Sequence, residues 1–144
     1  NFFVFVGDTP FINSNNISTM ISSHINSKSD CTFLYSVFPF DLPYARLIFN
    51  DNELIKLVES VHLLDKQKHL NNLFTSQYLF NSELFLRHIA DLRKDPKTNE
   101  YNLTDIINIY ISNRYKMNPI LIEEFWTLMG INTIDDIAML NSYK

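Results

Sequence analysis

The sequence predicts an α/β fold in which a mixed, mainly parallel sheet is flanked by helices. Short β-rich apolar runs alternate along the chain with segments whose apolar residues recur at helical spacing. Apolar residues make up 46% of the 144 residues, which is enough to build one core. Because the sequence contains no repeat, low-complexity tract or linker, residues 1–144 are expected to form a single unit.

The first half of the chain predicts a strand, a helix, a second strand and a hairpin. Residues 2–6 form a continuous apolar run bounded by Gly7-Asp8, which is typical of a buried strand in a parallel sheet. Ser14-Asn15-Asn16 can cap the first helix. A strand is expected at residues 31–38, and strands 44–49 and 54–58 are expected to pair around a turn at residues 50–52.

The second half continues the alternation of strands and helices. A strand is expected at residues 73–80, followed by a helix that Ser82 caps. Asn102 and Asp105 resemble a capping box and open the next helix. A further strand is expected at residues 120–125, and Asn132 or Thr133 caps the last helix.

Composition argues against several classes of function. The net charge of −4 gives no basic surface for nucleic acid, and no apolar run approaches the ~20 residues of a membrane span. The first six residues are apolar but carry no basic leader, so a signal peptide is not expected. The single cysteine, Cys31, excludes an internal disulfide and is expected to be a small buried apolar residue. A cytoplasmic protein is therefore expected. The chain has only two glycines, Gly7 and Gly130, so it carries no glycine-rich loop of the kind that cradles phosphates.

Asp8 is the first candidate for chemistry. It follows the first expected strand, at the end where open α/β sheets place their ligands. A carboxylate there can bind Mg²⁺, which prefers oxygen ligands. Asp8 is equally compatible with a turn residue in Gly-Asp-Thr-Pro that hydrogen-bonds its own backbone.

Five segments, in order along the chain, resemble the bacterial N-acetylglucosamine-1-phosphate uridylyltransferases. The segments, with the family patterns in parentheses, are residues 6–11 (G-D-x-P-L/F), 43–48 (G-Y-G-R-I), 55–59 (I-V-E), 100–107 (E-Y-Y-L-T-D-I-I) and 130–132 (G-V-N). Each motif alone is weak, but the shared order makes chance matches improbable. The resemblance covers essentially the whole chain and begins roughly two-fifths of the way into the family's nucleotidyltransferase domain.

The resemblance implies a reaction and a set of site residues. The family joins UTP and N-acetylglucosamine 1-phosphate, giving UDP-N-acetylglucosamine and pyrophosphate, with Mg²⁺ neutralising phosphate charge. Asp8 and Asn132 match the two metal ligands, and Glu59 matches a carboxylate that hydrogen-bonds sugar hydroxyls. The positions on the sugar-phosphate side are matched by Tyr44, Ala45, Tyr101 and Thr104.

The chain also departs from the family pattern. No segment resembles the family's first strand and its glycine-rich loop with Thr, Arg and a catalytic Lys, so no catalytic residue is assigned and the segment is expected to begin within a domain. Pro43 and Ala45 replace the two glycines around Tyr44. Phe74 replaces an asparagine that contacts the sugar, and a phenyl ring cannot make those hydrogen bonds; Ser76 replaces a nearby glycine.

Each matched residue also has a purely structural interpretation. Asn132 could be only a helix cap, Glu59 a polar strand end, and Tyr101 and Thr104 packing and capping residues. Arg46 is expected on a solvated face and Phe74 in the core. Two functions therefore remain open: a uridylyltransferase completed by another segment or chain, and a non-catalytic remnant or interaction domain. A third, another nucleotidyltransferase such as a cytidylyl or guanylyl enzyme, is disfavoured by the match at residues 100–105.

Partners follow from the same interpretations. UTP and a sugar 1-phosphate are the ligands if the nucleotide-binding segment is supplied. A sheet that lacks its first strands leaves unpaired N–H and C=O groups, so self-association or a partner covering that edge is expected. No nucleic acid or membrane partner is expected.

Overall fold

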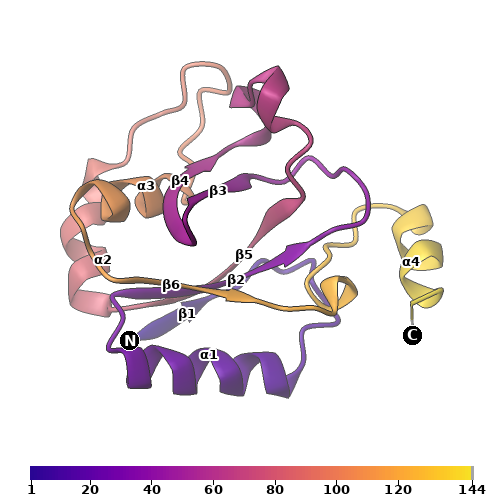
Figure 1. Ribbon diagram of the computed structural model, residues 1–144, viewed down its shortest axis with the longest axis horizontal. Coiled ribbons are helices and arrows are strands. Elements are labelled where there is room, and N and C mark those ends of the chain that lie inside the picture. Colours follow the sequence, from indigo (N-terminus) through magenta and orange to yellow (C-terminus); the bar gives the residue numbers. More distant parts are fainter. Residues whose placement is uncertain (144) are drawn as a thin grey trace.

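The computed structural model describes residues 1–143, which form one sheet with helices around it (Figure 1). The strand order is β4-β3-β5-β2-β6, and β1 also pairs with β5. The strands are β1 (Phe2–Val4), β2 (Cys31–Val37), β3 (Arg46–Asn50), β4 (Glu53–Val58), β5 (Asn72–Phe80) and β6 (Met117–Leu121). Nearly all the expected strands therefore exist, within a few residues of their expected bounds.

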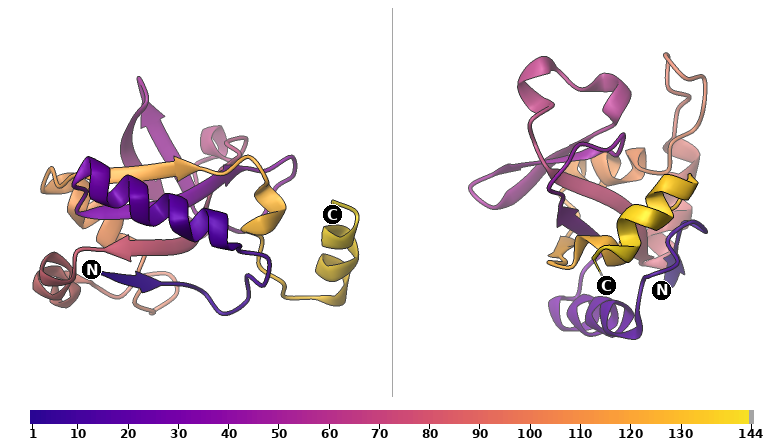
Figure 2. Two further views of the ribbon diagram at one scale, coloured as in Figure 1. Left: turned by 90° about the horizontal axis from the view of Figure 1, so that it is seen from below. Right: turned by 90° about the vertical axis from the view of Figure 1, so that its right-hand side faces the viewer.

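Helices lie on both sides of the sheet. They are α1 (Ser14–Ser27), α2 (Ser82–His88), α3 (Asp105–Ser112) and α4 (Ile134–Asn141). Short 3-10 turns follow β4 at Ser60–His62 and Asp65–Gln67, α2 at Ile89–Asp91 and β6 at Phe125–Thr127. Figure 2 shows α1 against one face of the sheet and α4 set apart beside it. Within residues 1–143, no helix is long and apolar enough to span a membrane.

Strand direction differs from the expectation. The mixed sheet with flanking helices is confirmed, but the expectation of mainly parallel strands was wrong. Among the described residues only β2 and β6 pair in parallel, whereas β5 runs antiparallel to β1, β2 and β3, and β3 is antiparallel to β4. Continuous apolar runs report that a strand is buried on both faces, and they carry no information on its direction.

The two faces of the sheet build separate parts of the core. Along β2, the side chains of Cys31 and Phe33 join the larger cluster, which includes the hairpin, α2 and α3, whereas Leu34 joins a cluster with Met20 of α1. This is the alternation that a pleated strand imposes. Cys31 is fully buried, as expected, and burial raises the pKa of its thiol.

The bounds predicted for the first and last strands were wrong. β1 ends at Val4 and is only half-buried, and Phe5 and Val6 beyond it are exposed. It pairs only with β5, so one of its edges has no partner strand within residues 1–143. The strand expected at 120–125 is β6, Met117–Leu121, in which Pro119 is tolerated because β6 lies at the edge of the sheet.

Helix caps shift by one residue from several expected positions. Asn13 caps α1 and Asn81 caps α2, each accepting a backbone N–H on its side-chain oxygen. Thr133 caps α4 in a capping box with Asp136. The capping box expected at Asn102 does not form; Thr104 stands at the start of α3, and its side chain makes no capping hydrogen bond.

The hairpin of β3 and β4 is confirmed, and the rest of the fold holds it from two sides. Asp51 and Asn52 lie in the left-handed region at φ 47° and 68°, which suits a two-residue hairpin turn. The Asn108 side chain of α3 accepts the Leu57 N–H and donates to the Leu57 carbonyl, both at 2.9 Å, so α3 covers the outer edge of β4. On the other side, β3 pairs with β5 only at Arg46 and Leu73.

A bulge interrupts β5 near its middle. Phe33 of β2 pairs with Tyr78, but Tyr35 pairs with Phe74, so β5 carries extra residues between these points. Ser76, within the bulge, adopts φ 61°, a conformation that favours glycine. The bulge turns Phe74, Thr75 and Ser76 toward a small hollow beside Asp8.

Candidate functional site

Asp8, Tyr44 and Gly130 meet at this hollow, although they are far apart in sequence. The Tyr44 hydroxyl accepts the Gly130 N–H at 2.9 Å, and the Asp8 carbonyl accepts the Ile131 N–H at 2.8 Å. A Cβ at Gly130 would stand 2.8 Å from Asp8 Oδ2 and 3.2 Å from the Tyr44 hydroxyl. Only glycine at this position lets the carboxylate and the phenol approach the backbone so closely.

The hollow has a volume of about 160 Å³, and its walls come from four parts of the fold. The segment after β1 contributes Asp8 and Thr9, the loop before β3 contributes Tyr44, and the β5 bulge contributes Phe74, Thr75 and Ser76. Leu128 and Gly130, from the segment between β6 and α4, complete the wall. Burial raises the pKa of the Tyr44 phenol, so the hydroxyl stays protonated near neutral pH.

Asp8 and Asn132 are close through their backbones and chemically suited to a hard cation. Asn132 follows Ile131, whose N–H binds Asp8, and Asn132 lies ahead of the Thr133 cap. The Asn132 backbone N–H donates to Asp136 Oδ2 at 2.8 Å, so its own side chain is not used for capping. Carboxylate and amide oxygens are the donors that Mg²⁺ prefers, and it commonly takes one or two protein ligands plus substrate phosphates.

The described residues do not supply a complete set of metal ligands. Among residues 1–143, no three His, Cys, Asp or Glu side chains gather closely enough to hold a metal ion. The pair Asp8 and Asn132 fits a site that substrate oxygens and water complete. The metal assignment for these two residues stays a prediction.

Glu59 and Thr104 also come together, but they belong to a different cleft. The Thr104 hydroxyl donates to Glu59 Oε1, which is why it does not cap α3. Glu59 lines a cleft of about 480 Å³ between the end of β4, the loop at 62–67, the loop at 93–96 and the start of α3. Asp105 lines the same cleft, and burial raises the pKa of its carboxyl group.

A histidine–aspartate pair in this cleft escaped the sequence analysis. His62 Nε2 contacts the buried Asp95 carboxylate, which also accepts the Lys97 N–H at 2.7 Å and the Thr98 N–H at 3.1 Å. The hydrogen bond with His62 is the main reason that the pKa of Asp95 is lowered. These residues are 33 positions apart, and no spacing rule indicates the pair.

The remaining predicted residues lie outside both hollows. Ala45 is buried, and its carbonyl accepts the Phe74 N–H at 2.9 Å, which joins the start of β3 to β5. Tyr101 is 63% exposed, with Lys94 Nζ 5.8 Å from its ring centre. The substrate-binding roles of Tyr44, Ala45, Glu59, Tyr101 and Thr104 remain predictions.

Arg46 contradicts the expectation of a solvated side chain. It is 2% exposed, which makes it one of the largest fully buried side chains of the described residues. Its guanidinium group donates to the backbone carbonyls of Leu42 and Tyr44 and pairs with the Asp41 carboxylate. The strand pattern could not show this, because the acceptors belong to the loop before β3.

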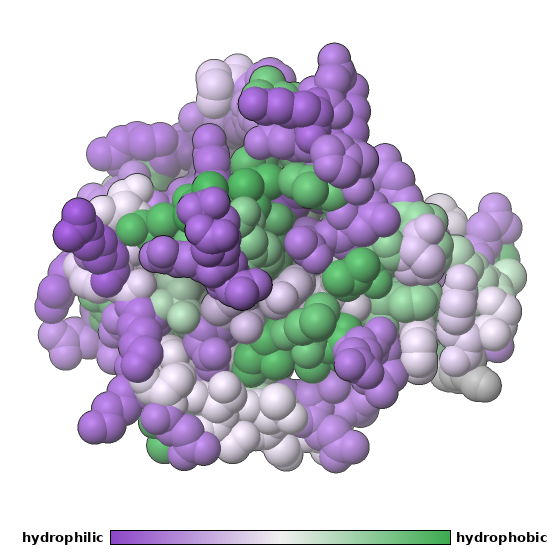
Figure 3. Space-filling model, viewed as in Figure 1, coloured by the Kyte–Doolittle hydropathy of each residue, from purple (hydrophilic) through white to green (hydrophobic). Residues whose placement is uncertain are grey.

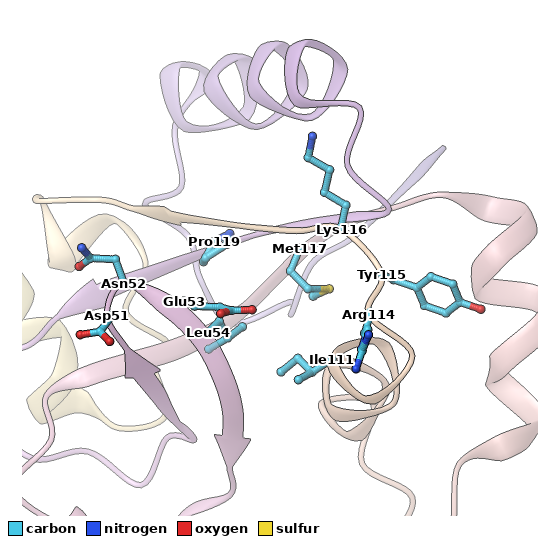
Figure 4. Close-up of a pocket in the computed structure, with 10 residues that line it drawn as sticks. All are labelled: Asp51, Asn52, Glu53, Leu54, Ile111, Arg114, Tyr115, Lys116, Met117 and Pro119. Carbon is cyan, nitrogen blue, oxygen red and sulfur yellow. The ribbon is translucent and has the colours of Figure 1, made fainter.

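A further hollow, of about 640 Å³, lies between the β3–β4 turn and the connection from α3 to β6 (Figure 4). In Figure 4 the side chains of Leu54, Ile111 and Met117 point toward one another, whereas Tyr115 and Lys116 point away. Figure 3 shows apolar surface between the hairpin and β6, surrounded by hydrophilic residues. Its lining mixes apolar residues with charged ones, among them Glu53 and Arg114, and contains none of the site residues that the resemblance implies.

The curated proteins that the chain resembles include bifunctional GlmU proteins. No family model matches the chain. It is 28% identical over 137 residues to the bifunctional protein GlmU of Streptococcus pyogenes, covering 94% of this chain and 29% of that protein. The GlmU protein of Clostridium perfringens is 28% identical over 139 residues, covering 96% of this chain and 30% of that protein. The chain thus spans about three-tenths of the length of the curated relatives it matches.

Solved structures show the same fold. A putative glucose-1-phosphate thymidylyltransferase from Bacillus anthracis, in complex with a sucrose, superposes with a TM-score of 0.67 at 19% identity, covering 97% of this chain and 52% of that chain. A 4-diphosphocytidyl-2C-methyl-D-erythritol synthase from Anaerococcus prevotii gives 0.56 at 16% identity, covering 98% of this chain and 57% of that chain. The chain is therefore similar to a segment of the GlmU proteins and has the Rossmann-like fold of the nucleotidyltransferases.

Proposed function

We propose that this chain forms the sugar-phosphate side of a UDP-N-acetylglucosamine pyrophosphorylase-like nucleotidyltransferase and is not catalytic by itself. The observation that carries the proposal is the meeting of Asp8, Tyr44 and Gly130 around one hollow. These residues come from three of the five segments that resemble the uridylyltransferases.

In the proposed reaction, a phosphate oxygen of N-acetylglucosamine 1-phosphate attacks the α-phosphorus of UTP. The new P–O bond forms as the bond to the β-phosphate oxygen breaks, and pyrophosphate leaves. Asp8 and Asn132 would hold Mg²⁺, which supplies neutralisation of the phosphate charge. Tyr44 holds the Gly130 backbone beside Asp8, and Glu59, oriented by Thr104, would accept hydrogen bonds from sugar hydroxyls.

The sequence supports inactivity of residues 1–144 alone. The two glycines, Gly7 and Gly130, are too far apart to form a phosphate loop, and Phe74 stands where the family has a sugar-binding asparagine. The loss of one preorganised charge-stabilising group typically lowers a rate about 10²–10³-fold, and several such groups are missing here. UTP and the sugar phosphate are therefore substrates only when a further segment or chain supplies the nucleotide-binding loop.

The metal part of the proposal is tested with Mn²⁺, a paramagnetic substitute for Mg²⁺. Because the chain has two glycines, ¹⁵N-glycine labelling gives two amide signals. Mn²⁺ should broaden both glycine signals, because Gly7 precedes Asp8 in the chain and Gly130 lies against its carboxylate. Asp8→Asn should raise the Mn²⁺ concentration that this broadening needs about tenfold or more, because the ligand charge is lost. Asp135→Asn, an exposed carboxylate in the first turn of α4, is the matched control and should leave the Mn²⁺ effect unchanged.

A catalytic assay on the same sample completes this test. We expect no pyrophosphate release from UTP and N-acetylglucosamine 1-phosphate above a control without protein. Turnover that Asp8→Asn removes would contradict inactivity of the isolated chain. Broadening that needs the same Mn²⁺ concentration in wild type and in Asp8→Asn would refute the metal site.

A second candidate function, an interaction domain, is favoured by the unpaired edge of β1. The Phe3 and Phe5 rings stack at 5.1 Å beside this edge, and Phe5 is 37% exposed. Exposed strand edges with apolar neighbours pair with other chains. We expect light scattering to detect a dimer or larger species at micromolar concentration, and Phe5→Lys to shift it toward monomer. A strictly monomeric wild type across that range would exclude self-association.

A further inference from the structure

The structure assigns Arg46 as a positioning residue that sets Tyr44 against Gly130 and Asp8. The inference rests on the proposed function, since Tyr44 and Asp8 form the proposed site. Arg46 does not line the hollow beside Asp8, and it contacts neither Asp8 nor Asn132. Its effect on the site passes through the loop that carries Tyr44.

The first step of the argument is the burial of the guanidinium group. A charged group that is only 2% exposed costs free energy unless its partners are well placed. Its Nη1 donates to the carbonyls of Leu42, at 3.0 Å, and of Tyr44, and its Nη2 contacts Asp41, which is mostly exposed. Nε has no hydrogen-bond partner within residues 1–143, so the contacts that offset the burial are those to residues 41–44.

The second step concerns Tyr44, which lies in the loop that Arg46 binds. The carbonyl of Tyr44 that Arg46 binds belongs to the residue whose hydroxyl accepts the Gly130 N–H. The Tyr44 ring packs edge-on against Phe38, with centroids 5.9 Å apart, so its side chain has little freedom once its backbone is fixed. A guanidinium group can bind several acceptors at once in a fixed plane, which a lysine ammonium cannot reproduce.

The third step links Tyr44 to the proposed metal ligand. The Tyr44 hydroxyl and Asp8 Oδ2 both lie next to the Cα of Gly130, since a Cβ at that position would touch both oxygens. If the loop moved outward, the Gly130 N–H would lose its acceptor and the backbone beside Asp8 would shift. Arg46 therefore connects the start of β3 to the segment before α4 through one aromatic side chain.

The test uses the chemical shift of the Gly130 amide in the ¹⁵N-glycine-labelled chain, measured against an added shift standard. Tyr44→Phe removes the acceptor, so the Gly130 amide proton should move upfield. Arg46→Met should move the Gly130 signal in the same direction, and Arg46→Lys should restore it only in part. The Tyr44→Phe, Arg46→Met double variant should show no larger shift than Tyr44→Phe alone, because both changes break one chain of contacts.

A matched control separates positioning from general destabilisation. Arg93 also donates to two backbone carbonyls, of Ala90 and Leu92, but in a different loop, so Arg93→Met should leave the Gly130 signal in place. Mn²⁺ affinity should fall about tenfold in Arg46→Met, as is typical for residues that orient metal ligands. A Gly130 signal that stays in place in folded Arg46→Met overturns the inference. If wild type binds no Mn²⁺, the proposed function fails, and the glycine signal still decides the role of Arg46.

Discussion

Replacing Phe74 with Asn, the residue type of the family at this position, is expected to destabilise the chain by about 3–5 kcal/mol rather than restore a sugar contact. Phe74 is 2% exposed, and its ring meets those of Phe33 and Tyr78 edge-on at 5.2 and 5.1 Å. An asparagine there leaves a cavity and a buried amide without partners, and each adds to the cost. Single domains are stable by about 5–15 kcal/mol, so this change removes a large share of the stability.

Urea unfolding followed by the fluorescence of the only tryptophan, Trp126, measures this loss. Phe74→Ala should cost a similar amount, because both changes empty the same space. Leu86→Ala, at a side chain that is 70% exposed, is the control and should stay within about 0.5 kcal/mol of wild type. A loss below about 1 kcal/mol for Phe74→Asn would show that the ring does not support the core.

The second large effect is expected at Asn108, whose amide covers the outer edge of β4. Asn108→Ala removes both hydrogen bonds to Leu57 and leaves its N–H and C=O without these partners. Each hydrogen bond contributes about 0.5–1.5 kcal/mol net, so the loss of two should lower the free energy of unfolding, measured in urea, by about 1–3 kcal/mol. The uncovered edge should also make the variant more prone to aggregate on concentration.

Asn113 offers a control on the same helix. Its side chain donates to the Ile109 carbonyl at 2.8 Å, at the exposed end of α3, and touches no strand. Asn113→Ala should cost at most about 0.5 kcal/mol and should not aggregate. Equal effects of the two substitutions would mean that Asn108 acts on the helix alone.

The sequence predicted the strands and the hairpin better than it predicted orientation and burial. The turn at Asp51 and Asn52 was recognisable because asparagine and aspartate tolerate the left-handed conformation that a tight hairpin needs. The direction of β5 was not, because an apolar run looks the same in either direction. The meeting of Asp8 with Gly130 and Ile131 had no signal in the local pattern, which does not relate the two ends of the chain. The resemblance implied only that Asp8 and Asn132 share one metal ion, which stays a prediction.

Two site features had no sequence signal at all. Arg46 lies among apolar neighbours in its strand, but its acceptors are carbonyl groups of the preceding loop, and carbonyls are the same at every residue. His62 and Asp95 meet because two loops close over one cleft, and loop paths are not encoded in periodicity. Both features depend on tertiary contacts between segments that the sequence pattern treats as separate.

The single pairing of β3 with β5 bears on the distance between the two parts of the proposed site, the metal side at Asp8 and the sugar side at Glu59. Asp8 and Gly130 lie in loops beside the main sheet, whereas Glu59 directly follows the hairpin and Thr104 directly precedes α3. Backbone bonds join these bodies at one strand pairing, Arg46 with Leu73, and the core between them is made of side chains such as Leu47, Tyr78 and Ile106. The distance between these two parts is therefore set mainly by the packing of these side chains and not by a continuous backbone ladder.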